Sequence, residues 1–131
     1  MPLNSSKAQV KSGKSRGIHV TWLSSDTLDT SLVRDLIRAV NLVSFRFFLK
    51  EELRRLVDGK WVKCVGCFIP PSTVDIALKS SDDIYAVVCE EVLHYLGFSD
   101  PKAAQMAVEL AKLPRVRKSV RKRLKSLGIY I

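Results

Sequence analysis

The sequence predicts an α+β domain in which a small antiparallel or mixed sheet of three to four strands is followed by three C-terminal helices. Short segments that alternate apolar and polar residues lie before residue 79, whereas apolar residues at three- and four-residue spacing dominate after residue 83. Strands gathered ahead of helices are typical of this class. Hydrophobic residues make up 47% of the 131-residue chain, so it can bury a core, which excludes a wholly disordered protein.

The N-terminal part predicts a tail, a strand and a helix. Residues 1–16 are rich in Ser, Lys and Gly and lack apolar periodicity, so we expect a flexible basic tail ahead of a single domain at 17–131. Alternation over 17–23 predicts a strand. Residues 24–27 supply turn and cap residues, and leucines at spacings of four predict a helix over 28–40.

The middle of the chain predicts the other strands. The aromatic segment 44–49 favours a strand, and the charged segment 50–56 that follows is compatible with a helical turn. Asp58-Gly59 indicates a tight turn, after which Lys60 to Ile69 reads as one return strand ended by two prolines. Residues 74–78 alternate again and predict another short strand. We expect the aromatic residues of these strands, Trp61 included, to be buried.

Three helices complete the chain. A cap cluster at 80–83 precedes a helix over 84–96 that Gly97 closes in the C′ position. Pro101 is expected in the first position of the next helix. Pro114 opens the last helix, and Gly128 stops it.

The net charge of +9 is concentrated at the two ends of the chain. Residues 1–16 carry four basic side chains and residues 112–131 carry eight, with no acid in either segment, whereas residues 17–111 hold 10 basic and 13 acidic side chains. In the last helix the residues Leu113, Val116, Val120, Leu124 and Leu127 form an apolar stripe, and the basic residues occupy the rest of the circumference. Because no acid neutralises this helix internally, we expect a partner outside it to do so.

Nucleic-acid phosphate is the partner we favour, because clustered cations that release counterions give strong, sequence-independent attraction. A membrane surface is disfavoured because the stripe has neither Trp nor Phe. The alternative is a homodimer in which the acidic body of one copy meets the basic helix of another. The residues expected to bind nucleic acid are Lys7, Lys11, Lys14, Arg16, Arg115, Arg117, Lys118, Arg121, Lys122 and Lys125.

A structural zinc site is a second hypothesis, and we otherwise expect no cofactor. Cys64 and Cys67 form a C-x-x-C pair, and Cys89 and His94 lie on the following helix, which together supply a suitable ligand set. Cys89 and His94 are five residues apart and point about 140° away from each other on a helix. Cys89 also falls on the apolar stripe, so the alternatives are a packed core thiol for Cys89 and a disulfide at the C-x-x-C pair.

The segment from Glu90 to Asp100 resembles the metzincin-like zinc-peptidase pattern H-E-x-x-H-x-x-G-x-x-H/D, with Glu90 in place of the first histidine. The resemblance implies Glu91 as general base, His94 and Asp100 as metal ligands beside Glu90, and Gly97 as the glycine that ends the helix. It would make the protein a metal-dependent hydrolase. The alternative is an acidic helix face on which Glu90 and His94 pair at i,i+4, and we expect a protein without enzymatic activity.

Taken whole, the chain resembles small proteins encoded by viruses of hyperthermophilic archaea, such as a spherical virus of Pyrobaculum. The resemblance rests on overall length, on the opening MPLNSSKAQVKSGKSRG and on the segment VKCVGCFIPPSTVDIAL. It carries no activity, but it implies a host cytoplasm or a virion and favours intracellular disulfides. The first 16 residues lack the apolar region of a secretory signal, which also favours the cytoplasm.

Overall fold

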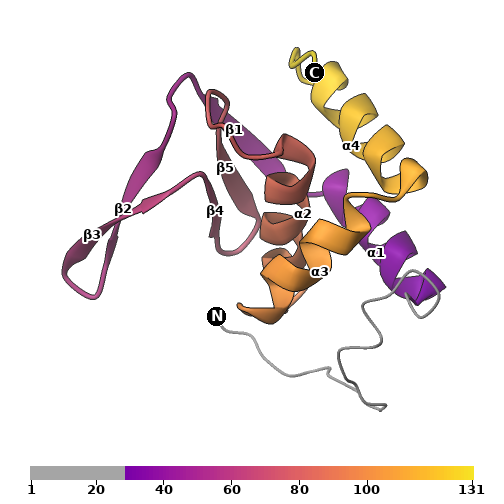
Figure 1. Cartoon of the computed structure of the whole chain (residues 1–131), viewed down its shortest axis with the longest axis horizontal. Coiled ribbons are helices and arrows are strands. Elements are labelled where there is room, and N and C mark those ends of the chain that lie inside the picture. The colour runs from indigo at the N-terminus through magenta and orange to yellow at the C-terminus, as the bar shows by residue number, and fades with distance from the viewer. Residues whose placement is uncertain (1–28) are drawn as a thin grey trace.

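The computed structural model describes residues 29–131 and confirms the α+β class (Figure 1). The tail with Lys7, Lys11, Lys14 and Arg16 and the strand expected over 17–23 lie outside the described residues. The elements in chain order are α1 (Thr30–Val40), β1 (Ser44–Phe48), β2 (Leu53–Val57), β3 (Lys60–Cys64), β4 (Gly66–Ile69), β5 (Thr73–Ala77), α2 (Ile84–Tyr95), α3 (Lys102–Leu110) and α4 (Pro114–Ser126).

The main sheet is mixed and has the order β1-β5-β4. The central strand β5 runs parallel to β1 and antiparallel to β4, and its residues from Val74 to Ala77 are buried. Asp75 is buried within this strand, and Arg46 opposite it on β1 donates from Nε and Nη2 to its two carboxylate oxygens at 2.7 and 2.8 Å. This bidentate pair neutralises the Asp75 carboxylate, which would otherwise be an unpaired buried charge in the central strand.

Strands β2 and β3 form a separate antiparallel hairpin, here called the arm, that extends away from the helices (Figure 1). The helical turn considered for residues 50–56 is therefore wrong, because Leu53–Val57 pairs with β3 instead. The single strand expected from Lys60 to Ile69 is divided at Val65, where the chain leaves the arm and joins the main sheet. The Val65 carbonyl accepts a 2.9 Å hydrogen bond from the Ala77 amide, which fixes this junction to β5.

Trp61 is not in the core, contrary to expectation: 70% of it is exposed on the arm, opposite Leu56 in the strand register. The alternation pattern identified its strand correctly. It could not show that no other part of residues 29–131 covers the ring.

The helices begin and end close to the predicted residues, with two corrections. Helix α1 is capped by Asp29, whose carboxylate accepts from the Ser31 amide at 2.9 Å, rather than by residues 24–27. Pro101 occupies the N-cap of α3 rather than its first helical position. Helix α4 starts at Pro114 as predicted.

Helix α2 is the centre of the core. It packs on β4 and β5 and also contacts α1, α3 and α4, so that all the helices lie on the side of the main sheet away from the arm (Figure 1). The fully buried side chains with the largest volumes come from every helix and from β5, with Val43 between α1 and β1: Leu36, Val40, Val43, Val74, Ile76, Val88, Val92, Leu93, Met106, Leu110, Val116 and Leu124. Among residues 29–131, no helix is long and apolar enough to cross a bilayer.

Candidate functional site

Helix α4 is fixed to the core by its apolar stripe. Val116, Val120 and Leu124 are completely buried, Leu113 is half-buried, and Leu127 at the end of the helix is 40% exposed. The stripe packs against α1 and α2. The predicted amphipathic helix is therefore confirmed, and its orientation relative to the rest of the molecule is set.

Four basic residues lie on the opposite side of α4, and we call them the basic row: Arg115, Lys118, Lys122 and Lys125. Spacings of three and four residues place them within an arc of about 80°, roughly opposite the stripe, along about 15 Å of helix. All four are exposed. Within the described part of the chain, none of them has an ion-pair or hydrogen-bond partner. The row is thus an exposed line of four unneutralised charges.

Two further arginines of α4 pack against Tyr85 of α2. The Arg117 guanidinium lies 3.8 Å from the centroid of the Tyr85 ring, and its Nη1 donates to the Ala111 carbonyl at 3.2 Å. Arg121 donates from Nε to the Tyr85 hydroxyl at 3.0 Å. The role in nucleic-acid binding that the sequence predicts for both arginines stays a prediction, and their contacts with Tyr85 also hold α4 on α2.

Arg123 attaches the other side of α4 to the residues at the start of β1. Its Nη2 donates to the Val43 carbonyl at 3.1 Å, and its guanidinium lies 6.0 Å from the Phe45 ring. Sequence reasoning missed these partners and the role of Tyr85. One signal was present: a tyrosine on a buried stripe requires a polar partner for its hydroxyl, and basic residues are abundant on α4.

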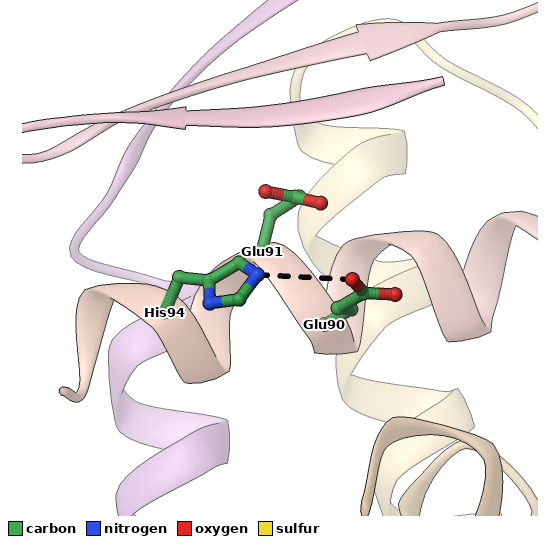
Figure 2. Close-up of side chains that lie close together, drawn as sticks. All are labelled: Glu90, Glu91 and His94. Atoms are coloured by element: carbon green, nitrogen blue, oxygen red, sulfur yellow. Dashed lines mark ion pairs between the residues drawn. The ribbon is translucent and has the colours of Figure 1, made fainter. Parts of the chain in front are cut away.

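A second cluster of functional groups lies at the C-terminal end of α2 (Figure 2). Glu90, Glu91 and His94 each offer a possible ligand atom, and these three atoms lie within 4.8 Å of one another. The Nε2 atom of His94 is 3.7 Å from Glu90 Oε2 and 3.4 Å from Asp100 Oδ2. The predicted i,i+4 pairing of Glu90 with His94 is confirmed, and Asp100 joins it from the loop before α3.

The His94 ring is held on both sides. Its Nδ1 lies 2.9 Å from the Phe98 carbonyl oxygen, and its Nε2 faces the carboxylates. Burial lowers the pKa of His94, but Glu90, the Phe98 carbonyl, Glu91 and Asp100 outweigh this effect and raise it to about 9. The hydrogen bond from His94 in turn lowers the pKa of Glu90.

Glu91 differs from Glu90 because Glu91 is only 7% exposed. Figure 2 shows its side chain directed toward the strands, where Gly66 of β4 leaves room for it. Burial raises the pKa of Glu91 to about 7. The face expected to be an exposed acidic surface therefore contains one buried carboxylate.

A cavity of about 410 Å³ adjoins this cluster. It lies between the β3–β4 junction, α2 and α3, and its polar lining includes Cys64, Asp82, Asp83, Glu90 and Glu91. Two of the clustered carboxylates are therefore reachable from this hollow.

The four-residue zinc site expected from the sequence is not formed. Cys64 and Cys67 are free thiols with their Sγ atoms 3.6 Å apart, but Cys89 is completely buried in the core and His94 belongs to the carboxylate cluster. Burial raises the pKa of Cys89 to about 12, in keeping with the packed core thiol considered as the alternative. The helical geometry that separates Cys89 from His94 explains the outcome.

Comparison with protein-family models, with curated proteins and with solved structures finds no match for this chain. The geometry brings Glu90, Glu91 and His94 together with Asp100 next to His94. It leaves Arg115, Lys118, Lys122 and Lys125 exposed on α4, with side chains that have no partner in the described part of the chain. These two arrangements are the starting points for function.

Proposed function

We propose that the protein binds nucleic acid through the phosphate backbone, with the basic row of α4 as its contact surface. The observation that carries this proposal is that the row is exposed and that its side chains have no partner among residues 29–131, while Arg117, Arg121 and Arg123 hold the same helix in place. A rigid helix that presents a line of cations can contact successive phosphates without ordering a flexible segment first.

The energetics favour a polyanion as the partner. Like charges three or four residues apart on a helix destabilise it by about 0.2–0.5 kcal/mol per pair, and no acid of α4 offsets this repulsion. Phosphates would remove the repulsion and release their condensed counterions. Four phosphate contacts predict a log–log dependence of affinity on salt with a slope of about −3.6 on duplex DNA.

This mode of binding depends on the charge and spacing of the phosphates and not on the bases. The expected affinity is therefore nearly independent of the nucleic-acid sequence. The tail residues Lys7, Lys11, Lys14 and Arg16 are proposed to add phosphate contacts. Deletion of residues 1–16 should make the salt dependence shallower while leaving the contribution of the row intact.

Fluorescence anisotropy with mixed-sequence duplex DNA, single-stranded DNA and RNA, at about 50 and about 200 mM salt, tests the proposal. The informative variant changes all four residues of the row to glutamine. A matched control changes Arg34, Lys50, Lys60 and Lys79 to glutamine, which removes the same number and types of exposed basic residues elsewhere. We expect the row variant to lose most of the affinity and the control to retain it; equal losses would contradict the proposal.

The homodimer alternative predicts a different result in the same samples. If the row binds the acidic body of a second copy, sedimentation of the protein alone should show a dimer that dissociates as salt rises. Protein that remains monomeric at low salt and binds DNA supports the nucleic-acid proposal.

A further inference from the structure

The end of α2 carries side chains whose separations match those of ligands around a metal ion. Bonds of about 2.0–2.2 Å to a tetrahedral zinc ion place neighbouring ligand atoms about 3.3–3.6 Å apart. The His94 Nε2 atom lies 3.7 Å from Glu90 Oε2 and 3.4 Å from Asp100 Oδ2, and Glu91 adds an oxygen within 4.8 Å of the Glu90 and His94 donors.

The helix end also fixes the tautomer that a metal requires. Gly97 adopts φ +105°, and the Phe98 amide donates to the Leu93 carbonyl at 3.0 Å, so the chain reverses in a Schellman motif. This turn brings the Phe98 carbonyl to 2.9 Å from His94 Nδ1. The Phe98 carbonyl holds the Nδ1 proton, so an ion that replaces the proton on Nε2 would meet the usual outer-shell arrangement of a metal-binding histidine.

The described part of the cluster holds more carboxylates than cations. Glu90 and Asp100 both pair with the single imidazole of His94. Glu91 lies beside them, is only 7% exposed and has a hydrogen bond with the Phe68 backbone. A divalent cation would balance negative charge that one imidazolium does not.

We propose that Glu90, Glu91 and His94 bind one divalent transition-metal ion, with Asp100 beside His94. A set of one imidazole and two carboxylates suits Zn²⁺, Mn²⁺ or Co²⁺, and the nitrogen ligand disfavours Mg²⁺ and Ca²⁺. Because Glu90 and Glu91 line the 410 Å³ cavity, the ion is reachable from solvent. This site is independent of the basic row, and either can exist without the other.

The test uses the full chain without a polyhistidine tag, stripped with chelator and titrated with Zn²⁺ by calorimetry. We expect one ion per chain and little binding of Mg²⁺. His94→Ala and Glu90→Gln should each weaken Zn²⁺ affinity by at least about tenfold. The control Glu109→Gln removes an acid of α3 outside the cluster and should leave the affinity unchanged.

A second measurement uses only the wild-type chain, so it does not require that any variant folds. Co²⁺ added to the wild-type chain should give visible absorption of low-symmetry coordination, and Zn²⁺ should displace it. Two results would overturn the proposal: failure of the wild-type protein to bind Zn²⁺ stoichiometrically, or equal affinity in correctly folded His94→Ala. The cluster would then be a histidine–carboxylate ion pair only.

Discussion

Gly66 illustrates how a single residue sets the position of the α2 cluster. A Cβ atom at this position would lie 2.6 Å from Val87 Cγ1 and 3.0 Å from Glu91 Cγ. The missing side chain therefore lets the first residue of β4 pack directly on α2 and leaves space for the buried carboxylate. In the sequence, Gly66 was only one residue of an expected strand, because nothing local indicates which helix will pack against it.

Gly66→Ala should destabilise the fold by about 1–3 kcal/mol, because the added methyl group overlaps Val87. Urea unfolding measures the change. Adding Val87→Ala to the same chain should recover part of the loss by removing the overlapping methyl groups, once the cost of Val87→Ala alone is subtracted. No recovery in the double variant would show that Val87 is not the obstruction.

The three cysteines should differ in reactivity because their burial differs. Cys64 is half-buried at the edge of the cavity, whereas Cys67 and Cys89 are buried, with the pKa of each raised to about 12 chiefly by burial. Since the thiolate is the reactive form, we expect iodoacetamide at mildly alkaline pH to modify Cys64 first and Cys89 only after unfolding. Peptide mass spectrometry measures the order in which the three cysteines are modified. Modification of Cys89 at the rate of Cys64 in folded protein would contradict its burial.

At the scale of elements, α4 combines a structural and an exposed face. Its stripe, its N-terminal proline and its stop at Gly128 follow from spacing and composition, so the helix was predictable from the sequence. Which basic residues are free was not predictable, because that depends on Tyr85 and on the Val43 carbonyl, both distant in sequence. Of the six residues expected on α4 to bind nucleic acid, the four of the basic row have side chains with no partner among residues 29–131, while Arg117 and Arg121 also contact Tyr85.

Leu124→Ala should cost about 2–5 kcal/mol of unfolding free energy, because this side chain is completely buried in the stripe. Leu127→Ala, at a site 40% exposed on the next turn, should cost clearly less. Thermal or urea unfolding compares the two. Similar losses would mean that α4 is not anchored through its stripe.

The strands show which structural features could not be predicted from the sequence pattern. Alternation located the segments, but it did not show that Lys60 to Ile69 serves two sheets, because a strand's partner depends on distant residues. The exposed Trp61 and the buried Asp75 have separate causes: nothing in residues 29–131 covers the Trp61 ring on the arm, and Arg46 neutralises the acid in the central strand. The α2 cluster was partly predictable, since Glu90 and His94 share a helix face, but Glu91's burial depends on β4.

In the whole molecule, the core, the arm and the basic row occupy different places. The core forms around α2, and the arm projects from one side (Figure 1). The basic row lies on the exposed face of α4, opposite the buried stripe. Residues 17–111 carry more acidic than basic side chains, so the excess positive charge is concentrated at the two ends of the chain. The attraction for polyanions that we propose would therefore arise mainly there. We expect the basic row of α4 to supply a large share of that attraction.

The salt dependence of DNA affinity tests this claim most directly. Anisotropy titrations over a range of salt concentrations should give a log–log slope for the wild-type chain that is steeper than that of the row variant by about 3.6, with the matched control close to wild type. Equal slopes for the wild-type chain and the row variant would show that α4 does not contact phosphates and would contradict the account.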